Sequence, residues 1–168
     1  PLVVAATEAV AAPGGVTKRS ATVEAALGVH VAYDVLSPPD ADGETPPVIV
    51  LLHGAGGSAA VWWRNATHLA STGHVVIQWD ARCFGRSRGD VATQFHPRCF
   101  TDDLLAILDV ENVASAVLVC QSMGGWTGLP MACRHPERVS ALLLCGTPGS
   151  YALVDNDGPR PVLCPPFP

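Results

Sequence analysis

The stretch AVLVCQSMGG, at residues 116–125, decides the fold of this chain. Ala116–Val119 is a short apolar run rich in β-branched residues, which is typical of a buried parallel strand. Gly125–Arg134 has helical spacing of its apolar residues and stops before Pro136, so a helix is expected there. Strand, sharp turn and helix follow one another directly. This order predicts a strained turn that exposes the Ser122 hydroxyl at the carboxyl end of a sheet.

A second loop, HGAGGS at residues 53–58, follows another apolar strand, Val48–Leu52. A glycine-rich loop after a strand can offer a backbone N–H group to a developing oxyanion. Because the carboxyl ends of parallel strands meet at one edge of a sheet, we expect this loop to lie beside the Ser122 turn. The two loops together predict acyl-transfer chemistry with serine as the nucleophile.

Alternating strands and helices complete the pattern along the chain. The other regular segments expected are a β-hairpin (Ala21–Ala26 and Val29–Leu36), two strands (Val75–Trp79 and Val139–Leu144) and two helices (Ala60–Ser71 and Phe100–Leu108). They predict an α/β fold class, with a doubly wound, mostly parallel sheet and an N-terminal β-hairpin.

A single domain is expected, because 168 residues of which 48% are hydrophobic support one core rather than two. Residues 21–150 would form this partial α/β domain. Residues 1–20 are expected to be a disordered lead. Residues 151–168 are expected to be irregular, because five prolines fall within the last ten positions.

Composition excludes several classes of function. The net charge of -5, with scattered basic residues, predicts no nucleic-acid partner and no anionic membrane surface as partner. No run reaches the ~18 to 20 apolar residues of a membrane span. The six cysteines show neither CxxC pairs nor zinc spacing, so no metal and no cofactor is expected. A reducing, cytoplasmic location is favoured; a secretory remnant at Leu2–Ala12 is the alternative. The oligomeric state is left open.

Four motifs, in order between about residues 22 and 150, resemble the α/β-hydrolase family, especially its lactonase, esterase, iminopeptidase and C–C hydrolase branch. They are LLHGAGGS (51–58), HVVIQWDARCFGRS (74–87), FTDDLLAILD (100–109) and VLVCQSMGGWTGLPMACRHPERVSALLLCGTPG (117–149). The resemblance implies a serine hydrolase of α/β-hydrolase type, truncated after its sixth strand. It also implies a small-molecule substrate with an ester, lactone or related acyl bond.

The resemblance further implies roles for individual residues. Ser122 corresponds to the nucleophile, and the backbone N–H groups of Met123 and Ala55 correspond to the oxyanion hole. The residues expected beside the pocket are His53, Gly54, Gln121 and Trp126. His53 corresponds to a residue that supports the oxyanion loop, and structural roles are favoured for Gln121 and Trp126.

Two positions depart from the family pattern. The loop from Asp80 to Ser87 resembles the motif D-x-R-G-x-G-x-S, but Cys83 stands at its first glycine. Cys120 stands at the first glycine of the serine motif G-x-S-x-G. Where such a position needs a positive φ or a close backbone approach, a Cβ costs on the order of 1 to 2 kcal/mol. Asp80 is expected to cap the turn and not to act as a catalytic acid.

The catalytic histidine is expected to be missing from the sequence. After Ser122 the only histidine is His135, and about ten helical residues at ~1.5 Å each would place it roughly 15 Å away. Asp155 and Asp157 lie where some family members carry the acid, but turn roles are favoured for them. We therefore expect a fragment whose acid and histidine lie downstream, and which is inactive as given.

Two other interpretations stay open. A non-catalytic hydrolase-fold protein that binds a ligand or partner would explain the missing histidine. Gly54–Ala59 also fits G-x-G-x-x-A after a strand, as in a dinucleotide-binding domain, with Asp80 ending the next strand. The hairpin and the Ser122 turn have no place in a nucleotide site, so this second alternative is disfavoured.

Overall fold

The computed structural model describes residues 2–39, 47–89 and 97–147. They form one eight-stranded sheet with the path order β1-β3-β4-β6-β5-β7-β8, in which β2 also pairs with β3. The strands are β1 (Leu2–Ala6), β2 (Val10–Ala11), β3 (Thr17–Ala26), β4 (Val29–Ser37), β5 (Val48–Leu52), β6 (Val76–Trp79), β7 (Ala116–Gln121) and β8 (Val139–Cys145). The expected α/β class and α/β-hydrolase type of sheet are confirmed.

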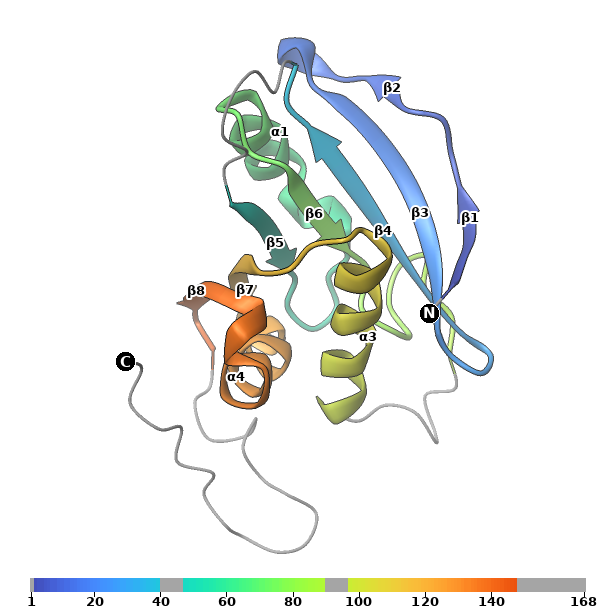
Figure 1. Cartoon of the computed structure of the whole chain (residues 1–168), viewed down its shortest axis with the longest axis vertical. Coiled ribbons are helices and arrows are strands. Elements are labelled where there is room, and N and C mark those ends of the chain that lie inside the picture. Colours follow the sequence, from blue (N-terminus) through green and yellow to red (C-terminus); the bar gives the residue numbers. More distant parts are fainter. Residues whose placement is uncertain (1, 40–46, 90–96, 148–168) are drawn as a thin grey trace, which may run out of the picture.

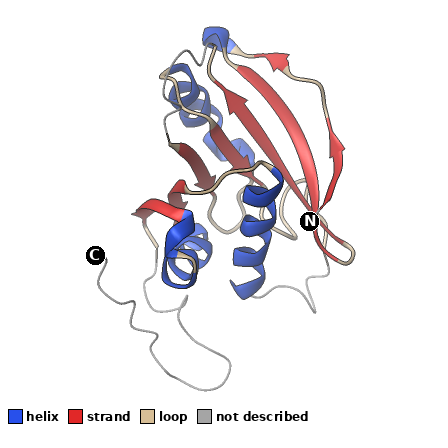
Figure 2. Ribbon diagram, viewed as in Figure 1, coloured by secondary structure: helices blue, strands red, loops and turns tan. Residues whose placement is uncertain are grey.

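The sheet has an antiparallel half and a parallel half (Figures 1 and 2). Strands β1 to β4 pair antiparallel with one another, and β4 pairs antiparallel with β6. Strands β6, β5, β7 and β8 run parallel. The expected N-terminal hairpin is β3–β4, and it is longer than predicted because Thr17–Ser20 extend its first strand.

The expected disordered lead over residues 1–20 is wrong. Strand β1 pairs with β3 from Leu2↔Glu24 to Ala6↔Ala21, and β2 pairs with β3 at Val10↔Lys18. Leu2 is 67% exposed, so backbone hydrogen bonds to β3, and not burial, hold the edge strand. A strand that buries little leaves no hydrophobic periodicity for sequence reasoning to detect.

Helices cover both faces of the sheet, as a doubly wound fold requires. They are α1 (Trp63–Ser71), α3 (Pro97–Val110) and α4 (Gly125–Arg134), with short 3-10 turns η1 (Pro13–Gly15), η2 (Ala59–Trp62), η3 (Ser122–Gly124) and η4 (Pro136–Arg138). In Figure 1, α3 lies beside α4, whereas α1 lies apart from them along β6. Helix α4 keeps Pro130 inside it and has the predicted bounds.

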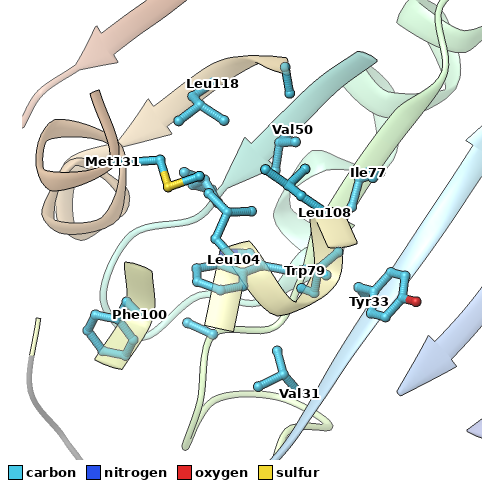
Figure 3. Close-up of a cluster of buried hydrophobic side chains, with 14 of the residues drawn as sticks. Val31, Tyr33, Val50, Ile77, Trp79, Phe100, Leu104, Leu108, Leu118 and Met131 are labelled. Atoms are coloured by element: carbon cyan, nitrogen blue, oxygen red, sulfur yellow. The ribbon is translucent and has the colours of Figure 1, made fainter. Parts of the chain in front are cut away.

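Alternate residues of the central strands supply two separate cores. Val50 and Leu118 belong to the larger core, which α3 and α4 cover with Leu104 and Met131 (Figure 3). Leu51 belongs to the smaller core under α1. Strong burial on both faces explains why β5 and β6 are nearly continuous apolar runs.

The cysteines do not behave alike. Cys83, Cys99, Cys120 and Cys145 form no disulfide, whereas Cys133 in α4 is disulfide-bonded. The disulfide of Cys133 does not favour the reducing compartment expected from the sequence, which stays a prediction. Within the described ranges no helix is long and apolar enough to cross a membrane.

Candidate active site

Ser122 lies on the turn that joins β7 to α4. Its φ is 49°, in the left-handed region, and it begins the short 3-10 turn η3. This confirms the predicted strained turn at the carboxyl end of the sheet. Ser122 is half-buried, and its hydroxyl makes no hydrogen bond to any residue that the structure describes.

The turn is pressed against the neighbouring strand β5. A Cβ added to Gly124 would lie 2.3 Å from the carbonyl oxygen of Leu52. Only glycine fits this position, because backbone atoms cannot move aside as a flexible side chain can. The close approach fixes Ser122 relative to the loop that follows β5.

Cys120 is accommodated by Gly128 of α4. Cys120 is fully buried at the end of β7, and a Cβ on Gly128 would lie 2.3 Å from its sulfur. A glycine at position 120, as in the family pattern, would need no such room. Here Gly128 of α4 has no side chain and so leaves room for the side chain of Cys120. Burial raises the pKa of the Cys120 thiol to about 12, so it is protonated and acts as a packing group. Cys120 also has no positive φ, so the expected strain does not arise there.

The loop at residues 53–58 contacts the Ser122 turn directly. The Gly54 N–H donates to Oε1 of Gln121 at 3.1 Å, and a Cβ on Gly54 would lie 3.2 Å from Cβ of Ser122. The expected neighbourhood of the two loops is therefore present, and Gln121 acts as the link between them. Ala55 is exposed and Met123 is buried. Whether their N–H groups share one oxyanion site stays a prediction.

His53 is buried, and both nitrogens of its ring are occupied. The Ala81 N–H donates to Nε2 at 3.0 Å, so Nε2 is unprotonated and Nδ1–H donates to the Gly54 carbonyl at 2.7 Å. Burial lowers the pKa of His53, and this outweighs the opposing effects of Gly54 and Asp80. The ring therefore ties the loop after β5 to the loop after β6, as its expected supporting role requires, and has no free nitrogen for Ser122.

Protonation of His53 is expected to destabilise the fold at low pH. Its pKa is lowered in the folded chain, so the unfolded chain binds a proton first as the pH falls below ~6.5, and stability decreases there by at most ~1.4 kcal/mol per pH unit. Urea unfolding between pH 7.5 and pH 5.5 measures this slope. The matched control is His53→Gln, in which the slope should be flatter; equal slopes in both proteins would contradict the assignment.

Asp80 is a structural carboxylate at the end of β6. Oδ1 accepts from the Ala59 N–H at 2.6 Å, and Oδ2 accepts from the backbone N–H and Nε of Arg86 at 2.9 and 2.7 Å. A Cβ on Gly85 would lie 2.6 Å from its carboxyl carbon. All these contacts hold the loops in place, so the expected turn-capping role is supported.

A protein-family model described as the alpha/beta hydrolase fold matches residues 47–161 of the chain. This match spans the Ser122 turn and the loop after β5. The chain belongs to the α/β-hydrolase family.

Named relatives of this chain differ in substrate. A candidate carbamate hydrolase, RutD, of Variovorax paradoxus (strain S110) is 34% identical over 140 residues, or 76% of this chain and 51% of the relative. The 2-hydroxymuconate semialdehyde hydrolase of Pseudomonas sp. (strain CF600) is 33% identical over 60% of this chain and 36% of its own. Est816, an N-acyl homoserine lactone degrading enzyme of solved structure, is 32% identical with a TM-score of 0.64, and 73% of this chain covers 44% of it. The chain spans about half the length of the first of these relatives.

Of the two cysteines that replace family glycines, Cys83 is the one with a strained backbone conformation. Its φ is 68°, which confirms that the position requires the left-handed region. Replacement Cys83→Gly is therefore expected to raise the free energy of unfolding by ~0.5 to 1 kcal/mol, after allowance for the greater freedom of glycine in the unfolded chain. Urea unfolding measures the change. Asn112→Gly is the matched control: asparagine tolerates its φ of 55°, so the gain there should be smaller. A loss of stability in Cys83→Gly would contradict the strain.

Sequence reasoning missed one buried ion pair of the hydrolase. Arg82 donates from Nε and Nη2 to the two oxygens of Asp103 at 2.7 and 2.6 Å, and both side chains are almost fully buried. The pair joins the loop after β6 to α3. The first aspartate of the pair Asp102–Asp103 is exposed, and the helical period would have identified the second as the inward-facing one.

The other residues that the sequence singled out take no part in the contacts around Ser122 described above. Trp126 packs against the larger core, in agreement with the favoured structural role. His135 caps the far end of α4 and lies 3.7 Å from Glu137. Asp155 and Asp157 lie outside the described residues. Within the parts of the chain that the structure covers, no cluster of three or more His, Cys, Asp or Glu side chains could hold a metal ion.

Proposed function

We propose that this chain carries the nucleophile and the oxyanion loop of a serine hydrolase that acts on an ester, lactone or related acyl bond. The observation that carries the proposal is the left-handed Ser122 turn between β7 and α4, packed against the loop after β5. Family membership alone would allow other nucleophiles, but serine stands at this position.

In this mechanism, Oγ of Ser122 attacks the carbonyl carbon of the substrate and its proton passes to a base. The carbonyl oxygen becomes an oxyanion, which the N–H groups of Met123 and Ala55 would stabilise. The alcohol leaves with a proton and an acyl-enzyme forms, and water then attacks the acyl carbon and releases the acid. The positive N-terminal end of α4 favours the charge that develops beside Ser122.

The substrate class follows from what the relatives share. A carbamate, a semialdehyde and a lactone all present a carbonyl carbon to a nucleophile. Specificity within this class rests on fold analogy alone, so the proposal names an ester-like acyl bond and no particular compound.

A second candidate function is ligand binding without catalysis. The observation that favours it is the free Ser122 hydroxyl: none of the described residues accepts its proton, and both nitrogens of the nearby His53 are occupied. A dinucleotide site gains no such support, because the Gly54 N–H, which a phosphate would need, already bonds Gln121.

Labelling with a fluorophosphonate probe tests the proposal. Because none of the described residues accepts the Ser122 proton, we expect the probe to label the chain at Ser122 only slowly, as peptide mass spectrometry would show, and Ser122→Ala to abolish labelling. Ser71→Ala, at the exposed end of α1, is the matched control and should label normally.

Turnover of p-nitrophenyl butyrate completes the test. With no base at Ser122 among the described residues, we expect at most the residual ~10³–10⁴-fold acceleration that remains when a triad member is absent. Fast hydrolysis that Ser122→Ala removes would show that a base reaches Ser122 after all. Neither labelling nor Ser122-dependent hydrolysis would leave the ligand-binding interpretation in its place.

A further inference from the structure

A cavity of about 560 Å³ lies between the N-terminal strands and α1, away from Ser122. A second hollow of about 480 Å³ lies along α1, and Pro13, Trp63 and Thr67 line both. Neither Ser122 nor Gly54 lines either of them. The volume is in the usual range for small-molecule sites.

A saturated carboxylate lies at the polar end of this cavity. Asp34 accepts from Ser20 at 2.6 Å, from Gln78 at 3.0 Å and from Arg86 at 2.7 Å, and it pairs with Lys18 at 2.9 Å. Burial opposes its ionisation, but these hydrogen bonds together lower the pKa of Asp34 to about 2. Asp34 is therefore charged and has little capacity left for another cation.

The two cations beside Asp34 retain unused donors. Lys18 uses its ammonium group for Asp34 alone, and Arg86 uses Nε and Nη1, which leaves Nη2 without a described partner. Their side chains are 38% and 45% exposed and both line the cavity. The polar end thus offers spare donors to an anion.

Apolar side chains, Trp63 among them, also line the cavity. Trp63 is 67% exposed, and the guanidinium of Arg64 lies over its ring at 5.1 Å. Leu36 and Ala66 form part of the buried lining near it. An exposed indole beside a cavity provides a stacking surface for a planar apolar group.

We propose that this cavity binds a small aromatic carboxylate. Its carboxylate accepts from Lys18 and Arg86, and its ring lies against Trp63. A neutral ligand would leave the spare donors without an acceptor, and an aliphatic anion would leave the indole uncovered. The proposal does not depend on Ser122 or on the proposed hydrolase activity.

Calorimetric titration of the full chain with 1-naphthoate tests the proposal. We expect a dissociation constant of ~1 mM or tighter. Lys18→Gln and Trp63→Ala should each weaken binding at least ~3-fold. Arg134→Gln removes the same charge from an exposed position in α4 and should leave binding unchanged. The neutral 1-naphthamide should bind more weakly than 1-naphthoate.

Lysine acetylation locates the binding independently, because Lys18 is the only lysine in the sequence. Saturating 1-naphthoate should slow acetylation of Lys18, as measured by peptide mass spectrometry. Absence of binding at 5 mM naphthoate (about five times the expected dissociation constant), unchanged affinity in either Lys18→Gln or Trp63→Ala, or unprotected Lys18 would each overturn the proposal.

Discussion

Replacement Gly124→Ala is expected to unfold the chain or to cost at least ~3 kcal/mol of stability. The added Cβ would lie 2.3 Å from the Leu52 carbonyl oxygen and 2.9 Å from the Leu52 carbonyl carbon. Both are backbone atoms of the central strand β5, which pairs with β6 on one side and with β7 on the other. Relief of the clash therefore requires that the Ser122 turn move away from β5, or that β5 move within the sheet.

Gly28→Ala separates this effect from ordinary backbone strain. Gly28 has a φ of 73° in the turn between β3 and β4, and an added Cβ would meet nothing within 4 Å. Its loss of stability should be only ~1 kcal/mol. Urea unfolding of the two variants and circular dichroism measure the difference. Similar losses in Gly124→Ala and Gly28→Ala would show that the turn is not held against β5.

Elements with strong burial were predictable from the sequence. The bounds of β5 agree with the predicted ones, because burial on both faces gives a continuous apolar run. The bounds of α4 agree as well, because the glycine pair before this helix and His135-Pro136 after it mark its ends. The edge strand β1 was not predictable, because its residues pair through the backbone, and Leu2, Ala5 and Ala6 within it are exposed. A backbone pairing partner more than fifteen positions away leaves no local pattern.

The parts of the site divide in the same way. The Ser122 turn and the glycine-rich loop after β5 are local motifs, so their sequence sufficed to predict that they lie side by side. The contact of Cys120 with Gly128 and the bond of Gln121 to Gly54 were not predictable, because each depends on how two elements approach in space. A departure from the family pattern at Cys120 is thus compensated on α4, whereas the strain at Cys83 remains.

These contacts connect three loops at the carboxyl edge of the sheet. His53 joins the loop after β5 to Ala81, and Asp80 joins the loop after β6 to Ala59. Gln121 joins the turn after β7 to Gly54. Ser122 is therefore held by polar groups that are already satisfied, which is the preorganisation that oxyanion stabilisation requires.

Loss of the Arg82 guanidinium is expected to be the second most damaging change. In Arg82→Ala the carboxylate of Asp103, whose side chain is fully buried, would lose two short hydrogen bonds and its only described ion-pair partner. Removal of one partner from a buried pair costs ~3 to 5 kcal/mol, because the remaining charge stays away from water. Urea unfolding at pH 7.5 measures the loss.

The double variant Arg82→Met/Asp103→Leu is the matched control. It removes both charges and keeps apolar volume, so it should be considerably more stable than Arg82→Ala. Acid gives a second test. Burial already raises the pKa of Asp103 against the opposing Arg82 charge, and without that charge the pKa rises further above its unfolded value. The folded Arg82→Ala chain then binds a proton more readily than the unfolded chain, so its deficit relative to the wild type should shrink as the pH falls. A deficit that is independent of pH and equal in the double variant would show that Arg82 stabilises the loop by packing and not by its charge.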